Sequence, residues 1–151
     1  TVRAFIYTTA LPPPVVAAAG AALAIVASEP GRREAVAHNA RRLRSALRDA
    51  GYTIPGNDGH IVPVVIGDSG ATMRTADALL RHGVLARGIR PPTVPPGTAR
   101  IRATVMATHT DADIDAAVAA FALAGEEEHL SQAGTPVASS EEHATSQPGC
   151  D

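Results

Sequence analysis

Arg90 is the side chain of this sequence that is best placed for chemistry, because it opens a stiff loop. Prolines occupy positions 91, 92, 95 and 96. Each proline fixes φ, removes a backbone donor and pushes the preceding residue toward an extended geometry. A guanidinium can bind a carboxylate through two parallel hydrogen bonds, and a rigid loop lowers the entropy lost on binding. The residues alone therefore predict either a carboxylate-binding arginine or an ordinary arginine in a surface turn.

Two strands are predicted to hold this loop in place. One covers residues 84–89, and the other covers residues 99–106, where apolar and polar side chains alternate. The apolar set is Ile101, Ala103 and Val105, and the polar set is Arg100, Arg102 and Thr104. Because successive side chains of a strand point to opposite faces, this alternation predicts a strand with one apolar face and one polar face.

The composition indicates an ordinary globular chain with neither a nucleic-acid nor a membrane partner. The chain has 151 residues, of which 45% are hydrophobic, and a formal net charge of −2. Its two tyrosines and two phenylalanines offer few rings for stacking on bases. The longest apolar run, residues 15–27, is shorter than the roughly 20 residues that span a bilayer. We therefore expect this run to form a buried helix.

The cysteine and histidine patterns exclude further kinds of site. The single cysteine, Cys150, allows no disulfide framework and no Cys-based zinc site, which is consistent with a reducing compartment and predicts a cytoplasmic protein. The sequence has no phosphate-binding glycine loop and no His/Glu pair at metal-ligand spacing, so no metal site is expected. His109, next to the start of the last predicted helix, is the one histidine that is a candidate for a chemical role; a histidine bound only to backbone is the alternative.

All thirteen basic residues are arginines. Because the chain has no lysine, it cannot itself form a Schiff base with a carbonyl compound. The chain also begins at Thr1, inside an apolar and strand-like run, rather than at a methionine. We therefore expect it to be part of a larger protein.

Hydrophobic periodicity and turn residues predict the order of elements. A short strand at residues 3–8 precedes a helix at 14–27, a second helix that Ser28 caps and that ends near Asp49, and a strand at 61–66. A helix at 70–82, the two strands around the Arg90 loop and a helix capped by Thr110 follow. This order predicts an α+β fold, β-α-β-β-α with a small sheet covered by helices, preceded by a strand and two long helices.

The predicted division is a connecting segment at 1–28, an α+β domain at 29–125 and a disordered tail at 126–151. The helix at 14–27 is apolar on every side, so the rest of a larger protein or a second subunit must cover it. In the second helix, we expect a buried stripe of Val36, Ala40, Leu43 and Leu47 and a solvated face of Arg32, Arg41, Arg44 and Arg48. In the helix at 70–82, we expect Met73, Ala76, Leu79 and Leu80 to be buried.

Four segments resemble, in order and spacing, the C-terminal part of the α-oxoamine synthases. They are Tyr7 to Pro13, Pro63 to Asp68, Ile89 to Arg102, and His109 with Thr110. The resemblance covers about residues 3 to 124. Its specific part is the Arg-Pro-Pro-Thr-Val-Pro element at 90–95, which is most similar to the biotin-pathway branch of the family. Branches that make 5-aminolevulinate, 2-amino-3-ketobutyrate or sphingoid bases are the alternatives.

The resemblance implies the small C-terminal domain of a homodimeric, aminotransferase-like enzyme that uses pyridoxal 5'-phosphate. Such an enzyme condenses an amino acid with an acyl thioester and releases CO2. Arg90 matches the arginine that holds the amino-acid carboxylate, and Thr93 matches a residue of the same loop at the substrate. Thr8 and Thr9 match a Ser/Thr pair that reaches the cofactor phosphate of the neighbouring subunit. The lysine, histidine and aspartate that act on the cofactor belong to the large domain, so no catalytic residue is expected in this chain.

Simpler interpretations of the same residues remain open. Thr8 and Thr9 could cap the helix that follows them, and Thr93 could be a turn residue. The whole chain could also be a stand-alone α+β module without catalysis, in which the Arg90 loop recognises a free carboxylate.

Overall fold

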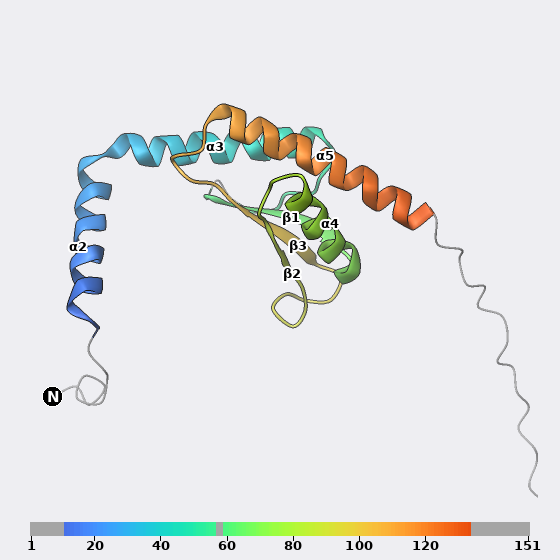
Figure 1. Ribbon diagram of the computed structural model, residues 1–151, viewed down its shortest axis with the longest axis horizontal. Helices are drawn as coiled ribbons and strands as arrows, with labels where there is room; N and C mark the ends of the chain where they lie inside the picture. The colour runs from blue at the N-terminus through green and yellow to red at the C-terminus, as the bar shows by residue number, and fades with distance from the viewer. Residues whose placement is uncertain (1–10, 57–58, 134–151) are drawn as a thin grey trace, which may run out of the picture.

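The computed structural model describes residues 11–56 and 59–133 of the chain. Along the chain these residues form helices α2 (Pro13–Ser28) and α3 (Pro30–Asp49), strand β1 (Ile61–Gly67), helix α4 (Ser69–Arg81), strands β2 (Arg87–Ile89) and β3 (Ala99–Thr104), and helix α5 (Asp111–Ala133). The predicted α+β class and the order of these elements are confirmed (Figure 1). The strand predicted at 3–8 lies outside the described residues.

The three strands form one antiparallel sheet in the order β1-β3-β2. β1 is an edge strand, which suits Pro63, because a proline has no N–H to donate to a neighbouring strand. β3 lies in the centre and alternates as expected, with Ile101 and Ala103 buried and Arg102 and Thr104 exposed. The sheet therefore has one covered face and one open face, and the arginines of β3 lie on the open face.

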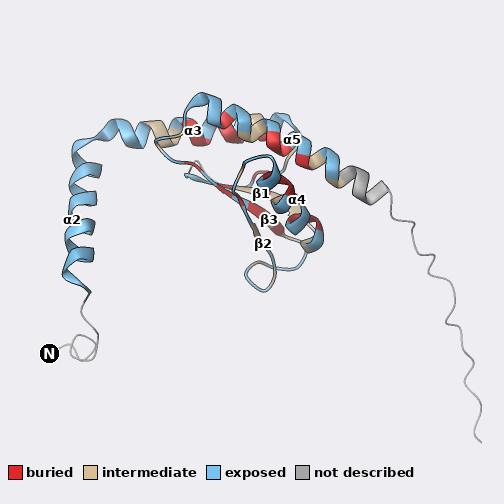
Figure 2. Cartoon of the chain, viewed as in Figure 1, coloured by how far each residue is buried: buried red, intermediate tan, exposed pale blue. Residues whose placement is uncertain are grey.

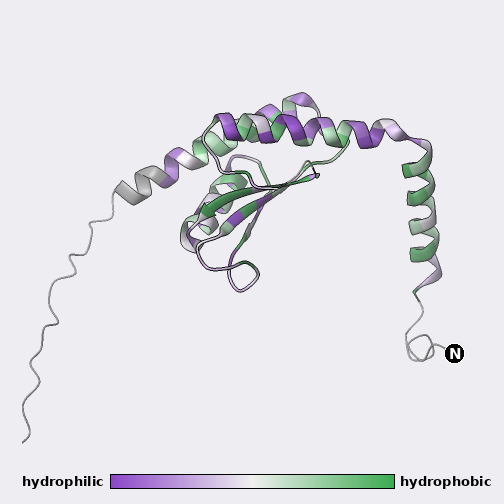
Figure 3. Cartoon of the chain, turned by 180° about the vertical axis from the view of Figure 1, so that it is seen from behind, coloured by the Kyte–Doolittle hydropathy of each residue, from purple (hydrophilic) through white to green (hydrophobic). Residues whose placement is uncertain are grey.

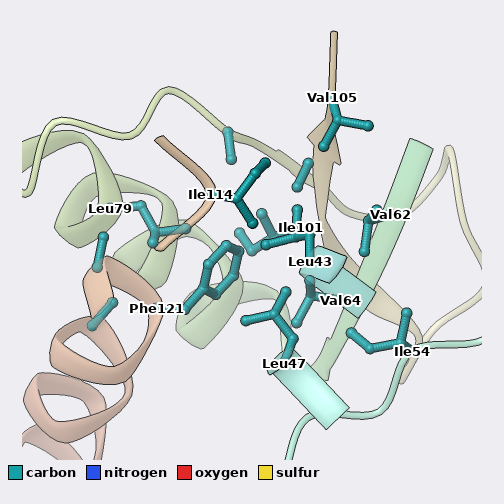
Figure 4. Close-up of a cluster of buried hydrophobic side chains, with 14 of the residues drawn as sticks. Leu43, Leu47, Ile54, Val62, Val64, Leu79, Ile101, Val105, Ile114 and Phe121 are labelled. Carbon is teal, nitrogen blue, oxygen red and sulfur yellow. The ribbon is translucent and has the colours of Figure 1, made fainter. Parts of the chain in front are cut away.

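Helices α3, α4 and α5 cover the apolar face of the sheet. Figure 4 shows that the buried side chains converge there from all of these elements. The predicted stripe of α3 is confirmed, because Ala40, Leu43 and Leu47 are buried and Val36 packs against the core. The largest fully buried side chain is Phe121 of α5, whose ring meets that of Tyr52 edge-on with centroids 5.7 Å apart.

The predicted role of Arg44 in a solvated face is wrong. Arg44 is 3% exposed, and its guanidinium donates hydrogen bonds to the carbonyl oxygens of Gly59 (3.0 Å) and Ile61 (2.7 Å). Gly59 and Ile61 lie where the chain enters β1, so the buried arginine fixes the start of this edge strand to α3. A buried cation can persist only when such partners replace water.

Ser28 does not cap α3. Its hydroxyl instead donates to the carbonyl of Ile25 in the preceding helix (3.5 Å), and Glu29 occupies the cap position without a side-chain hydrogen bond. Pro30 explains the shift, because proline is well suited to the first helical position and sets the start of α3 there.

The buried face of α4 differs from the predicted one. Leu79 is buried as expected, but Met73 is 38% exposed and Leu80 is 57% exposed. The small residues Ala71, Thr72, Thr75 and Ala78 take the buried positions instead. Close approach is the reason, since α4 packs so tightly on β2 that a Cβ at Gly88 would lie 3.0 Å from the Met73 sulfur.

The strand predicted at 84–89 begins only at Arg87. Gly83 has φ of 82°, and the N–H groups of Gly83 and Val84 close α4 on the carbonyls of Leu80 and Leu79. This is the Schellman arrangement of a helix end. Because the helix uses the Val84 donor, the chain must travel further before it joins the sheet.

Helix α5 begins with the predicted cap at Thr110. The Thr110 N–H and hydroxyl both donate to Asp113 Oδ2 (2.8 Å each), and the Asp113 N–H returns a bond to the Thr110 hydroxyl. The hydrogen bond from the Thr110 N–H makes the largest contribution to lowering the pKa of Asp113. The bond from the Thr110 hydroxyl and the charge of the His109 ring lower that pKa further.

Helix α5 continues to Ala133, beyond the boundary predicted at residue 125. Ion pairs with α4 support this extension. Glu128 pairs with Arg74 (2.6 Å), and Glu127 pairs with Arg81 and lies 2.8 Å from the His82 ring. The bond from His82 and then that from Arg81 lower the pKa of Glu127. Glu127 and Glu128, which the sequence analysis placed in a disordered tail, thus belong to α5 and pair it with α4.

The expectation of a buried helix at residues 15–27 is wrong for the described residues, because helix α2 stands away from this body. None of its residues is buried, and its axis is bent by 81° from that of α3 (Figure 2). Its surface is apolar on all sides, as Figure 3 shows. The Arg33 guanidinium donates to the carbonyl of Val26 across the bend. Among the described residues no single helix is long and apolar enough to cross a membrane; only α2 and α3 together, as a bent pair, reach that length and composition.

Candidate functional site

The loop after β2 is held by short-range hydrogen bonds. The N–H of Thr93 donates to the carbonyl of Arg90 (3.1 Å), which closes a turn around the cis bond between Pro91 and Pro92. A second turn follows, in which the N–H and hydroxyl of Thr98 both donate to the carbonyl of Pro95 (3.2 and 2.7 Å). The prolines and these turns together give the stiffness that the sequence predicts.

Arg90 and Thr93 lie at the two ends of the first turn, and both are exposed. Within the described part of the chain, neither the Arg90 guanidinium nor the Thr93 hydroxyl has a hydrogen-bonding partner or an ion pair. A guanidinium with all five donors free, placed on a stiff loop, is prepared for a planar anion such as a carboxylate. The structure therefore brings the two residues together in one turn and leaves both available to a ligand.

Three further arginines lie on the open face of the sheet, in the two strands that the Arg90 loop connects. Arg87 of β2 lies opposite Arg102 of β3, and Ile89 lies opposite Arg100. Like charges directly opposite each other destabilise a strand pair unless an anion neutralises them. No carboxylate of the described residues pairs with any of these three arginines, although Arg100 Nε donates to the carbonyl of Thr98 (2.9 Å). We call Arg87, Arg100 and Arg102 the arginine face.

Sequence reasoning identified Arg90 as a candidate site residue but did not identify the arginine face. The signal was present, because the alternation of β3 places Arg100 and Arg102 on the polar side. What the sequence lacked was the register, which sets Arg87 opposite Arg102. Thr8 and Thr9, the predicted cofactor-binding pair, lie outside the described residues.

His109 is tied to the connection between β3 and α5. Its Nδ1 accepts a hydrogen bond from the N–H of Met106 (3.3 Å). The buried Asn39 of α3 holds the same connection, because its amide donates to the carbonyls of Met106 (3.0 Å) and His109 (2.9 Å). These bonds favour the interpretation of His109 as a residue that orders the backbone. Its Nε2 makes no hydrogen bond among the described residues.

The chain belongs to the aminotransferase class I and II family. The family model matches residues 1–121, and the enzymes of this family depend on pyridoxal phosphate. The described helices and sheet agree with the folds of solved members.

Within that family, the relatives of the chain include 8-amino-7-oxononanoate synthases. The protein of that name from Geobacter sulfurreducens is 46% identical over 127 residues, which cover 83% of this chain and 32% of the relative. The enzyme from Geotalea daltonii is 45% identical over 125 residues, with 82% and 32% covered. The chain thus spans about a third of the length of the curated relatives that it matches.

Solved structures give the same class. Serine palmitoyltransferase from S. paucimobilis matches with a TM-score of 0.76 and 31% identity, over 82% of this chain and 32% of that one. An 8-amino-7-oxononanoate synthase from Francisella tularensis matches with a TM-score of 0.69 and 21% identity, over 84% and 37% of the two chains, and at that identity it supports the fold alone.

The residues of this chain do not form a complete site for pyridoxal phosphate. The sequence has no lysine to bind the cofactor aldehyde. The described residues offer arginines and a hydroxyl that suit a carboxylate, and no group of at least three His, Cys, Asp or Glu side chains among them could hold a metal. These groups are chemically suited to an anion, and the chain has no lysine that could form a Schiff base with the cofactor.

Proposed function

We propose that this chain is the C-terminal part of an α-oxoamine synthase of the 8-amino-7-oxononanoate type. The complete enzyme condenses L-alanine with a pimeloyl thioester and releases CO2, a step of biotin biosynthesis. The identity of 46% to a curated synthase supports this branch. The sphingoid-base branch is the second candidate, because a serine palmitoyltransferase shares the fold at 31% identity.

One observation carries the proposal: Arg90 presents an exposed guanidinium on a stiff loop, with no partner among the described residues. An amino-acid substrate of such an enzyme carries a carboxylate that must be bound first and released later as CO2. A rigidly held arginine can orient that carboxylate with little loss of entropy. Thr93, at the other end of the same turn, is proposed to contact the substrate through its hydroxyl.

The arginine face supports Arg90 in this role. Arg87 and Arg102 raise the local positive potential, which attracts an anionic substrate and favours its ionised carboxylate. The open face of the sheet is therefore proposed to look toward the active site of the complete enzyme. Bound pyridoxal phosphate would supply the electron sink for the reacting α-carbon, while this chain orients the carboxylate.

We further propose that the enzyme is a cytoplasmic homodimer. Thr8 and Thr9 would donate their hydroxyls to the cofactor phosphate of the partner subunit. The apolar surface of α2, which directly follows them, supports a position against other parts of the assembly. The thioester carrier is either coenzyme A or an acyl carrier protein.

The test is the substitution Arg90→Lys in the full-length enzyme, assayed with L-alanine and pimeloyl-CoA. Lysine keeps the charge but loses the two-pronged geometry. We expect kcat/KM for L-alanine to fall by roughly 10- to 100-fold, the effect of losing one charged hydrogen bond. The melting temperature should hardly change, because the exposed Arg90 side chain makes no hydrogen bond or ion pair among the described residues.

Arg41→Lys is the matched control, since Arg41 is exposed on α3, away from the arginine face. It should leave the kinetics unaltered. Wild-type kinetics in the Arg90 variant would show that Arg90 is only a turn residue. A full-length enzyme that forms no product from either amino acid, L-alanine or L-serine, with its acyl thioester would refute the proposed reaction itself.

A further inference from the structure

The arginine face is a charged surface that no carboxylate of the described residues neutralises. Arg87 of β2 lies directly opposite Arg102 of β3 in the antiparallel ladder. Like charges in this position destabilise a strand pair. Both residues are exposed on the open side of the sheet, so an anion that reaches this side can pair with them.

The acidic residues of the described part of the chain are badly placed to supply that anion. All of them lie in α3, α4 or α5, or at the residue that starts one of these helices. These helices cover the opposite, apolar face of the sheet (Figure 1). Several carboxylates there are already paired, as Asp115 is with Arg42 and Glu127 is with Arg81. A carboxylate for the arginine face must therefore come from outside the described residues.

Three of the four acidic residues outside the described part follow α5. They are Glu141, Glu142 and Asp151, and we call residues 134–151 the acidic tail. The tail contains no arginine or lysine. Asp58, the fourth acidic residue, precedes β1, which is the edge strand opposite to β2. The acidic tail thus carries three carboxylates, a charge complementary to the three guanidiniums of the arginine face.

The end of α5 lies within reach of this face. Glu128 pairs with Arg74 of α4, and the neighbouring Met73 lies against β2, because a Cβ at Gly88 would be 3.0 Å from its sulfur. These contacts keep Glu128 within about 25 Å of the backbone of β2, and the rest of α5 adds at most about 8 Å. Residues 134–142 span up to about 30 Å when extended, and arginine side chains are long. Because β2 is an edge strand, the tail can pass around it to the open face.

We propose that the acidic tail folds back around β2 and lies on the arginine face, with Glu141 and Glu142 beside Arg87 and Arg102. Because the tail is tethered, its local concentration at the face is in the millimolar range, so weak ion pairs hold it there for part of the time. A tail in this position competes with other anions for the face. Competition with a substrate rests on the proposed function, in which the open face looks toward the active site, whereas the contact itself does not.

The test places a nitroxide spin label next to the two glutamates, in the 151-residue chain labelled with ¹⁵N. The chain has one cysteine, so Ser140→Cys with Cys150→Ser gives a single attachment point. A nitroxide broadens the NMR signals of amides that come near it. We expect broadening at Arg87 and Arg102 and none in α2, which stands away from the sheet. Salt should reverse the broadening, since the Debye length falls from about 10 Å at 0.1 M to about 3 Å at 1 M.

The substitutions Glu141→Gln and Glu142→Gln together remove the charges of the tail next to the label. An exposed ion pair changes the ratio of bound to free tail by roughly 1.5- to fivefold, so the broadening should fall by at least about twofold. The matched control is Glu34→Gln with Glu126→Gln, which removes the same charge from exposed positions of α3 and α5. It should leave the broadening unchanged.

Reversal of both charges tests the pairing itself. Arg87→Glu with Arg102→Glu should abolish the broadening, and Glu141→Arg with Glu142→Arg should restore it in that background. Restoration also shows that the reversed sheet still folds.

Broadening that salt and the two glutamine substitutions leave unchanged overturns the proposal, as does equal broadening of α2 and the sheet. Broadening that arises only between a spin-labelled copy and a separate ¹⁵N-labelled copy also overturns it, because the tail then acts on another molecule. The contact needs neither the cofactor nor the reaction, so it can fail while the condensation assay of the full-length enzyme succeeds, and the reverse.

Discussion

Two arginines of this chain show how the environment of a single residue decides its use. Arg90 is exposed on a loop and has no partner in the described part of the chain, so its charge is available to a ligand. Arg44 is buried, and its guanidinium donates hydrogen bonds to two backbone carbonyls. Its Nε is buried without a hydrogen-bond partner among the described residues. Arg44 is therefore a structural cation, retained because it fixes β1 to α3.

The substitution Arg44→Ala should destabilise the chain strongly. It leaves the carbonyls of Gly59 and Ile61 buried without their donor, and it opens a cavity beside the core. We expect a loss on the order of 3 kcal/mol in the free energy of unfolding. Urea denaturation followed by circular dichroism measures it. Arg41→Ala, on the exposed side of the same helix, should change the free energy by less than about 0.5 kcal/mol; similar losses in both variants would contradict the structural role of Arg44.

The sequence could not separate these arginines. In α3, the apolar stripe of Ala40, Leu43 and Leu47 was predictable from its period. Arg44 borders that stripe, and a long side chain at such a position either reaches solvent or turns inward. Only the position of the chain that enters β1, about fifteen residues later, decides between the two.

At the scale of elements, the contact between α5 and the loop after α3 depends on one glycine. A Cβ built on Gly125 would lie 2.8 Å from the Tyr52 hydroxyl. That hydroxyl donates to the carbonyl of Phe121 (2.7 Å), and burial of the ring raises the pKa of Tyr52. The glycine lies inside a helix, where alanine is ordinarily better by about 1 kcal/mol.

The substitution Gly125→Ala should therefore destabilise the chain, by about 1 kcal/mol or more, despite its better helix propensity. In a Tyr52→Phe background the clashing oxygen is absent, so the same substitution should become neutral or stabilising. Thermal unfolding of the four proteins of this double-mutant cycle measures the coupling.

The comparison variant for this cycle is Gly20→Ala in α2. A Cβ there meets nothing within 4 Å, so helix propensity alone should act and should favour alanine. Additive effects of Gly125→Ala and Tyr52→Phe would show that the hydroxyl does not restrict the glycine.

Elements could be predicted from the sequence where the signal that sets them is local. The cap at Thr110 and the alternation of β3 are local signals, and both were predicted from the sequence. The late start of β2 follows from the cap at Gly83, because that cap consumes the Val84 donor. The extension of α5 to Ala133 depends on Glu127 and Glu128 finding partners on α4, which no local pattern shows.

At the scale of the whole molecule, the chain is proposed to provide one side of a site. It has arginines for a carboxylate but no lysine, and it spans about a third of its relatives. The identity of the family could be predicted from the loop at 90–102 and the segments around it. The surroundings of Thr8 and Thr9 could not be predicted from this sequence, because those residues are proposed to act on a second subunit.

A mixed dimer of the full-length enzyme tests that proposal. One subunit lacks the cofactor-binding lysine, and the other carries Thr8→Ala and Thr9→Ala. If the threonines act across the interface, the subunit with the lysine receives intact hydroxyls from its partner. The mixed dimer should then recover up to about half of the wild-type activity, since one of two sites is complete.

If the threonines act within their own subunit, the only site with a lysine also lacks them. Mixing would then restore nothing above the residual rate of the double-threonine variant, and the proposal would be refuted. Each altered homodimer must be assayed alone to set these limits.

The bend between α2 and α3 lies next to the first sites after α2 at which trypsin can cut the chain. Trypsin cuts after lysine or arginine, and residues 11–28 contain neither. The exposed Arg32 and Arg33 follow directly after the 81° bend. Trypsin therefore cannot shorten α2 step by step, and its nearest cuts detach the whole helix at the first turn of α3. The rate of this cut measures how firmly the surfaces around α2 hold it, without any assay of activity.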